Sequence, residues 1–319
     1  MQGLDLIKRT GVVAAAVTVL TLGSAVSPAA GQQSVATFKS SVDLVRITAV
    51  VRDRKGRFVQ DLSARDFEVL DGGLTRPITD FRTDSSGVSV ALLFDVSGSM
   101  EARLQNAREA AEHLLSWLDA KRDEAAIFTF DTRLVEVTPF TVGLKTLPSS
   151  MTSVVPFGAT SLNDAIARTA ERVGAREGRR RAVVVLTDGN DNASRMAAAA
   201  VSEVASAIDV PVYIFGVVAS IDNPSADTRT SAAEHSPLAG PLAELASKTG
   251  GHVVVASTIS ERSLAARQIV DELRHQYLLA FESSGRPGWH SLVVRSRVKD
   301  LTVRARSGYV AGQLHPNSD

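Results

Sequence analysis

The sequence lacks cysteine entirely and is poor in aromatic residues, which make up 5% of its 319 positions. The absence of cysteine excludes disulfide bonds, thiolate zinc sites, iron–sulfur clusters and cysteine nucleophiles, so any metal must be held by oxygen atoms or imidazoles. The scarcity of aromatic side chains predicts an aliphatic core. Thirty-five basic and 35 acidic residues cancel, and this balance argues against nucleic acid as a partner.

No apolar run is long enough to span a membrane. The run at residues 11–22 has 12 residues, whereas a spanning helix needs about 20. Lys8 and Arg9 precede it and small residues follow at 29–31, which is the layout of a secretory signal peptide. We expect residues 1–31 to be removed, leaving an exported protein, periplasmic or extracellular, with no membrane span in the mature chain. An uncleaved membrane anchor is the alternative.

The chain divides into a β-rich beginning, an α/β middle and a β-rich end. Residues 34–86 alternate short apolar stretches with turns, as strands do. Over 88–275, apolar strands alternate with amphipathic helices, which predicts a doubly wound, mostly parallel, Rossmann-like sheet. Residues 276–312 return to strand patterns. Because each β segment is too short to bury a core alone, we expect the two to pair in a small β-sandwich that flanks the α/β domain or contains it as an insertion.

The individual elements follow from periodicity and turn signals. Apolar residues recur at three- and four-residue spacing over 104–118, which predicts an amphipathic helix. The other predicted helices are 161–173, 196–208, 241–248 and 260–275. The predicted strands are 88–94, 125–130, 182–186, 210–217 and 252–256 in the α/β region and 277–281, 291–298 and 301–305 in the last segment.

Carboxylate and hydroxyl side chains follow two of these strands. Asp95, Ser97 and Ser99 lie in the turn after the strand at 88–94, and Asp188 follows the strand at 182–186. Thr160 stands between them at the start of a helix. Ligands of an open parallel sheet bind beyond the carboxyl ends of its strands, where strand order reverses. These hard oxygen donors therefore converge if the two strands are neighbours.

The pattern resembles the metal-ion-dependent adhesion site of the von Willebrand factor type A family, which is Asp-x-Ser-x-Ser with a distant Thr and a distant Asp. The resemblance covers residues 88–274 and implies one divalent cation, Mg²⁺ or else Mn²⁺ or Ca²⁺. In the family, hydroxyls coordinate directly, at least one aspartate acts through water, and the cation attracts a partner carboxylate. The flanks at 45–81 and 304–309 resemble an exported bacterial, notably acidobacterial, group of such proteins. The implied ligands are Asp95, Ser97, Ser99, Thr160 and Asp188.

Physical chemistry supports a metal site but leaves it incomplete. Mg²⁺ prefers six oxygen ligands, so three hydroxyls and two carboxylates leave a position open. A helix beginning near Ser99 would point partial positive charge at the cation, and Asp95 and Asp188 would offset it. Asp191 is a possible sixth donor, with a turn or capping role as the alternative. For an isolated Asp95 and Ser97, helix capping would be the simpler explanation.

The resemblance implies a non-catalytic, adhesion-type protein-binding module whose partner offers an Asp or Glu carboxylate. One alternative is a structural envelope component stabilised by its cation. Another is a phosphotransfer enzyme with Asp95 as nucleophile, but Ser97 stands where such an enzyme needs a second acid. The polar stretch 220–238 has no periodicity and is predicted to be a long loop on the same rim, which either selects the partner or is a solvated insertion.

Overall fold

The computed structural model describes residues 44–83, 86–176, 179–207, 209–217 and 238–311. All of them lie in one compact unit of the chain, Val42–Asp319. The predicted signal peptide and, apart from Leu238, the predicted loop at 220–238 lie outside the described residues. No described helix is long and apolar enough to cross a membrane.

A six-stranded sheet forms the centre of the α/β domain, in the order β10-β9-β8-β5-β6-β7. All neighbouring strands are parallel except β7, which is antiparallel to β6. The central strand β5 is buried along its whole length, as expected of a parallel strand covered on both faces. The bounds are β5 Val88–Asp95, β6 Glu124–Phe130, β7 Leu134–Val142, β8 Arg180–Thr187, β9 Val212–Val217 and β10 Val253–Ala256.

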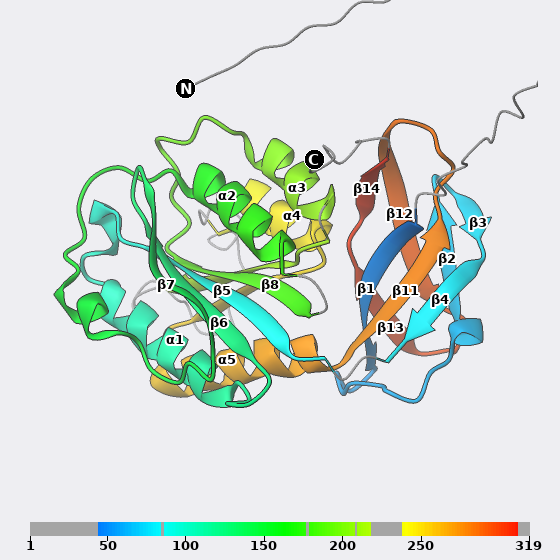
Figure 1. The fold of residues 1–319 in the computed structure, drawn as a ribbon, viewed down its shortest axis with the longest axis horizontal. Coiled ribbons are helices and arrows are strands. Elements are labelled where there is room, and N and C mark those ends of the chain that lie inside the picture. Colours follow the sequence, from blue (N-terminus) through cyan, green and yellow to red (C-terminus); the bar gives the residue numbers. More distant parts are fainter. Residues whose placement is uncertain (1–43, 84–85, 177–178, 208, 218–237, 312–319) are drawn as a thin grey trace, which may run out of the picture. The chain divides into compact units, whose positions relative to one another are not determined.

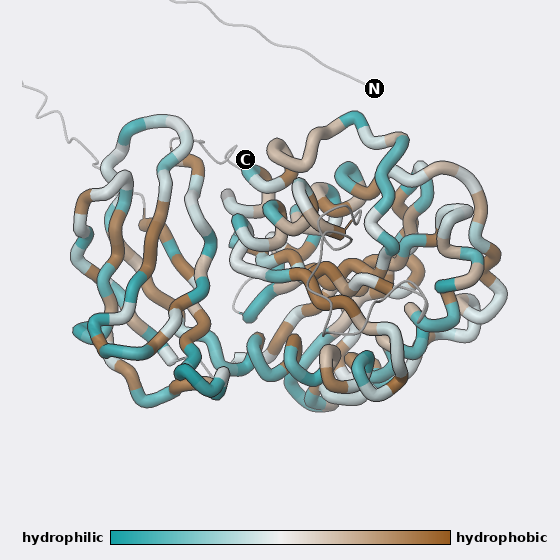
Figure 2. The backbone as a smooth tube through the Cα atoms, turned by 180° about the vertical axis from the view of Figure 1, so that it is seen from behind, coloured by the Kyte–Doolittle hydropathy of each residue, from teal (hydrophilic) through white to brown (hydrophobic). Residues whose placement is uncertain are grey.

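Helices cover both faces of this sheet (Figure 1). Val90 and Leu92 of β5 pack in the core with α1 and α5, whereas Ala91 and Leu93 pack in the core with α2, α3 and α4, because successive strand residues point to opposite faces. Figure 2 shows the apolar strands at the centre of this domain. The helices are α1 Leu104–Trp117, α2 Leu162–Gly174, α3 Ala198–Ala207, α4 Pro241–Lys248 and α5 Ile259–Arg274.

Two antiparallel four-stranded sheets make up the flanking sandwich, with orders β13-β1-β11-β4 and β14-β12-β2-β3. Each sheet combines strands from before and after the α/β domain, and their facing apolar residues share one core. The predicted fold class is therefore confirmed. The strands are β1 Leu44–Asp53, β2 Phe67–Asp71, β3 Leu74–Arg76, β4 Ile78–Arg82, β11 Gln276–Glu282, β12 Gly288–Ser296, β13 Leu301–Ala305 and β14 Gly308–Ala311.

The α/β domain lies between two paired strands of the sandwich. β4 precedes β5, α5 leads directly into β11, and Arg82 of β4 is the register partner of Leu278 of β11. Charged side chains also join the sandwich to α5. Arg52 Nη2 lies 2.7 Å from the buried Glu272 Oε1, and Arg304 bonds to the other oxygen of the same carboxylate. The α/β domain is therefore joined to the sandwich by the pairing of β4 with β11 and by the contacts of Arg52 and Arg304 with Glu272 of α5.

Candidate metal site

The carboxyl ends of β5 and β8 meet because these strands are adjacent and parallel, with Phe94 beside Leu186. Strand order reverses here, since β5 continues through α1 to β6 on one side whereas β8 lies on the other. Asp95 ends β5, and Asp188 follows Thr187, the last residue of β8. The two strand ends are thus neighbours at the switch point where ligands of open α/β sheets bind.

The loop after β5 is organised by the carboxylate of Asp95. Its Oδ1 accepts hydrogen bonds from the backbone N–H of Ser97 at 3.0 Å and from Ser97 Oγ at 2.6 Å. Ser97 Oγ lies 3.3 Å from Ser99 Oγ. Asp95 and Ser97 are fully buried, whereas Ser99 is exposed. Two of the predicted ligands therefore lie inside the protein, and the third faces solvent.

The expectation of a helix beginning near Ser99 was wrong. Ser97 has an extended backbone conformation, with φ −68° and ψ 166°, and is followed by a 3-10 turn at Gly98–Met100. The α-helix α1 begins only at Leu104. Because the influence of a helix dipole falls off within its first turn, α1 does not aim its positive end at Ser99 in the way we expected.

The second loop of the site, around Gly158, is bonded to the first. Phe157 donates its N–H to Val96 O at 2.9 Å, and Gly98 donates its N–H to Gly158 O at 3.1 Å. Gly158 has a φ of +85°, a conformation that glycine adopts without strain. These hydrogen bonds hold the loop against Val96 and Gly98, which lie between the predicted ligands Asp95, Ser97 and Ser99 in the sequence.

Thr160 links this second loop to the third, which follows β8. Its N–H donates to Asn192 Oδ1 at 2.8 Å, and its carbonyl accepts from the N–H groups of Asn192 and Ala193. Thr160 is 2% exposed. The structure therefore connects the loops carrying all five predicted ligands through hydrogen bonds at the carboxyl edge of the sheet.

One carboxylate oxygen of Asp188 is buried without a hydrogen-bond donor in the described residues. The residue is 7% exposed, and its Oδ1 accepts from the Asn190 N–H at 3.2 Å. Its buried Oδ2 has no hydrogen-bond partner within the described part of the chain. Arg103 Nη1 lies 3.6 Å from this oxygen and also donates to Ser99 O at 2.9 Å. No sequence pattern indicated a role for Arg103, because it lies beyond the ligand motif and approaches Asp188 only in the folded protein.

Burial dominates the electrostatics of Asp95. It raises the pKa of the carboxyl to about 6, although hydrogen bonds from Ser97 and Thr187 act in the opposite direction, and the nearby charge of Asp188 raises the pKa further. Thr187 Oγ1 donates to Asp95 Oδ2 at 2.7 Å and accepts from the Gly189 N–H at 3.0 Å. We did not predict this role for Thr187, although its position directly before Asp188 is the available signal.

These residues fit a hard divalent cation. Two buried carboxylates near one another are costly unless their charge is offset, and the ion pair with Arg103 offsets only one charge; Asp188 Oδ2 accepts no hydrogen bond in the described residues, so it can still serve as an oxygen donor. The hydroxyls of Ser97, Ser99 and Thr160 add donors of the type that Mg²⁺ and Ca²⁺ prefer. No cluster of three or more His, Cys, Asp or Glu residues suited to a metal occurs in the described ranges, so the donor set here depends on hydroxyls.

Asp191 has a different position. Its Oδ2 accepts from the Asn163 N–H at 2.8 Å, in the first turn of α2, and its Oδ1 accepts from the Ser194 N–H at 3.1 Å. Both carboxylate oxygens therefore serve backbone groups, which corresponds to the turn or capping role.

A family comparison identifies the domain that contains this candidate site. Residues 90–190 match the model described as the von Willebrand factor type A domain. The chain contains a type A domain. The matched segment includes most of β5 and all of α1, α2 and β8, with all five predicted ligands. None of the curated proteins compared with the chain matches it.

Solved structures similar to the chain also include type A proteins. An aerotolerance-related membrane protein from Bacteroides fragilis is 23% identical, with a TM-score of 0.48 over 59% of this chain and 98% of that one. A von Willebrand factor type A protein from Catenulispora acidiphila is 12% identical, with a TM-score of 0.47 over 86% and 76%. Proximal thread matrix protein 1 from the mussel byssus, with a zinc-occupied MIDAS motif, is 18% identical, with a TM-score of 0.45 over 64% and 49%.

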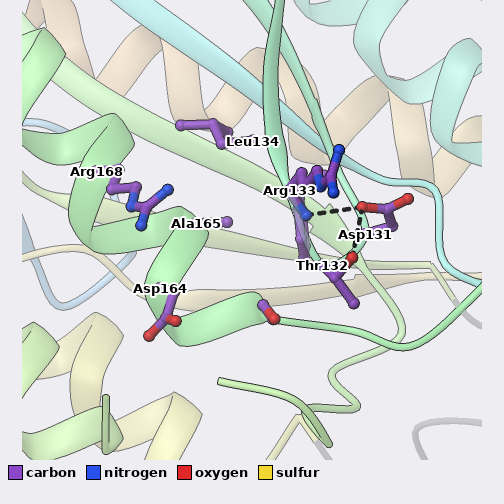
Figure 3. Close-up of a pocket in the computed structure, with 9 residues that line it drawn as sticks. Asp131, Thr132, Arg133, Leu134, Asp164, Ala165 and Arg168 are labelled. Atoms are coloured by element: carbon purple, nitrogen blue, oxygen red, sulfur yellow. Dashed lines mark hydrogen bonds between the residues drawn. The ribbon is translucent and has the colours of Figure 1, made fainter. Parts of the chain in front are cut away.

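A small polar pocket adjoins the candidate site in the type A domain, where Ser161 follows Thr160 (Figure 3). Asp131 Oδ1 accepts from the Arg133 N–H at 2.7 Å, and the Asp164 carboxylate accepts backbone N–H groups at 2.9 to 3.2 Å. The pocket is thus lined by both signs of charge, and its carboxylates already serve the backbone. It offers no donor set comparable to that around Asp95.

Proposed function

We propose that this chain is a cation-dependent protein-binding module. The observation that carries the proposal is the buried Asp188 Oδ2, which has no hydrogen-bond partner in the described ranges and lies near the buried Asp95. A divalent cation, Mg²⁺ or else Mn²⁺ or Ca²⁺, would neutralise both carboxylates and offer a Lewis-acidic position to a partner's Asp or Glu side chain. The residues that would hold it are Asp95, Ser97, Ser99, Thr160 and Asp188.

The arrangement favours binding over catalysis. Ser97 stands where a phosphotransfer enzyme using Asp95 as nucleophile would need a second acid, and its hydroxyl donates to Asp95 Oδ1. A serine hydroxyl is not a general acid at neutral pH. Ser99 is exposed, so the open side of the cation would face solvent and remain accessible to a macromolecule. Residues 1–31 have the layout of a signal peptide, and this layout supports a role outside the cytoplasm.

Removing Asp188 tests the cation site directly. In calorimetric titrations of chelator-treated protein with Mg²⁺ and Mn²⁺, we expect binding by the wild type and none by Asp188→Asn. Because Asp188 lies beyond the end of β8 and its Oδ2 holds no hydrogen bond in the described structure, the circular dichroism spectrum should not change. The control is Asp191→Asn, which removes an equal charge nearby and should retain wild-type affinity. Equal affinity in Asp188→Asn would refute the site.

A second experiment separates the binding module from a purely structural component. The immobilised protein is exposed to envelope extract with Mg²⁺ or with chelator, and Asp188→Asn serves as the matched control. Proteins retained only by the wild type in Mg²⁺ are the expected result. Thermal stabilisation by Mg²⁺ without any such retention would favour the structural alternative.

A further inference from the structure

Two large apolar side chains are exposed next to the candidate metal site. Val155 is 79% exposed and Phe157 is 80% exposed. Both lie in the short segment that leads from the 3-10 turn Ser149–Ser153 to Thr160. Isolated exposed hydrophobic residues are common, so their exposure gains meaning only from where they lie and how they are held.

The backbone around these side chains is fixed at three points. Val154 O accepts from Arg108 Nη2 at 3.0 Å, before Val155. Phe157 N–H donates to Val96 O at 2.9 Å, and the next residue, Gly158, accepts from the Gly98 N–H at 3.1 Å. The segment therefore presents its apolar side chains from an anchored backbone, so little ordering of the segment would oppose binding.

The same hydrogen bonds place Phe157 next to the proposed ligands. Val96 lies between Asp95 and Ser97 in the sequence, and Gly98 lies between Ser97 and Ser99. The backbone of Phe157 and Gly158 thus runs beside the loop that would hold the cation. With the proposed cation bound, the rim of the site would combine an attraction for negative charge with the exposed apolar side chains of Val155 and Phe157.

We propose that the partner presents a carboxylate and a neighbouring apolar side chain on one segment, the carboxylate binding the cation and the apolar group packing on Phe157 and Val155. This inference rests on the proposed function, because the cation makes the first contact. The apolar contact adds selectivity, since it imposes a second requirement beyond a surface carboxylate, which is common on proteins. Burying most of a phenyl ring is expected to strengthen binding roughly tenfold or more.

A peptide library tests this recognition rule. The library carries a fixed central Asp between randomised positions and is selected on the full chain in Mg²⁺, with elution by chelator. We expect Leu, Ile, Val, Met or Phe to be enriched close to the Asp. A selected peptide should lose roughly tenfold in affinity when its apolar residue is replaced by Gly.

Two variants test whether Phe157 causes the preference for an apolar residue near the Asp of the peptide. Phe157→Ser should abolish the apolar enrichment while leaving Mg²⁺ affinity at the wild-type value, because the anchoring hydrogen bond uses the Phe157 backbone. Leu74→Ser is the matched control, since Leu74 is 65% exposed and lies on β3 in the sandwich. It should keep the preference.

The outcomes distinguish this inference from the proposed function. The recognition rule is wrong if the protein retains acidic peptides in Mg²⁺ without apolar enrichment. It is also wrong if the enrichment persists in Phe157→Ser. Either result would leave the proposed binding module intact. If no selected peptide requires both Mg²⁺ and its Asp for binding, the proposed carboxylate-binding function is wrong, and the recognition rule is wrong with it.

Discussion

Asp95 is a buried carboxylate that accepts hydrogen bonds from Ser97 and Thr187. A proton and a metal cation would compete for this carboxylate. Burial favours the neutral form, while Ser97 and Thr187 stabilise the charged form. The first effect is larger, and the pKa rises to about 6. In a metal-free protein Asp95 consequently binds a proton more readily in the folded than in the unfolded state, so the contribution of this one group to stability increases as the pH falls from about 6 towards its ordinary pKa.

Cation binding by the wild type should therefore depend on pH. Because binding requires charged Asp95, the apparent Mg²⁺ affinity should be nearly constant above about pH 7 and fall roughly tenfold for each pH unit well below 6. Calorimetric titration over this range, with folding checked at each pH, makes the measurement. An affinity that stays unchanged down to about pH 5 would contradict a ligand role for an Asp95 whose pKa is raised by burial.

Arg103 should weaken cation binding through its charge. Its guanidinium lies 3.6 Å from the Asp188 oxygen that is proposed to face the cation. Arg103→Gln should raise Mg²⁺ affinity roughly threefold to tenfold at low salt, and less at high salt. Arg133→Gln, which removes an exposed charge elsewhere on the same rim, is the control. A lower affinity in Arg103→Gln would mean that its hydrogen bond to Ser99 O matters more than its charge.

At the level of elements, the site depends on the alignment of β5 and β8. The hydrogen bond from Thr187 Oγ1 to Asp95 Oδ2 joins their last residues and stabilises the charged carboxylate. Thr187→Val should raise the Asp95 pKa further and weaken Mg²⁺ binding by roughly fivefold to tenfold near pH 6.5. Thr187→Ser retains the hydroxyl and should bind like the wild type. Calorimetry at the same pH compares the three proteins, and equal affinities would show that this hydrogen bond does not tune the site.

The regular elements of the α/β region could be predicted from apolar pattern alone. Every predicted helix and strand there is present, with ends within two residues, because buried parallel strands and amphipathic helices leave strong periodic signals. Four strands were missed. β7 is a half-exposed edge strand that contains Pro139, and in the sandwich β3, β4 and β14 are only three, five and four residues long, so none of them produces a clear pattern.

The site could be predicted as a set of residue types but not as a geometry. The spacing of Asp95, Ser97 and Ser99, with Thr160 and Asp188 farther along the chain, identified the candidate ligands. It could not show the hydrogen bond from the Gly98 N–H to Gly158 O or the approach of Arg103 to Asp188. Both depend on how loops from distant parts of the chain pack, and local sequence does not encode that.

For the whole molecule, the sandwich needs both ends of the described chain. β1 lies between β11 and β13, and its residues Ile47, Ala49 and Val51 are fully buried in the shared core. A segment of residues 34–86 made alone lacks these partners, so it should aggregate or remain unfolded. Circular dichroism and size-exclusion chromatography of residues 34–86 and 88–275 make the test. Two soluble, separately folded fragments would contradict the insertion of the type A domain into the sandwich.

The pairing of β4 with β11 also has a mechanical consequence. These strands carry the chain into and out of the type A domain, and Arg82 pairs with Leu278 across them. A pulling force applied between residues 44 and 311 passes through the hydrogen bonds of the sandwich as long as this pair holds. The inserted domain then stays outside the path of the load. Tension along the chain between residues 44 and 311 would therefore leave the three loops around Asp95 unstretched.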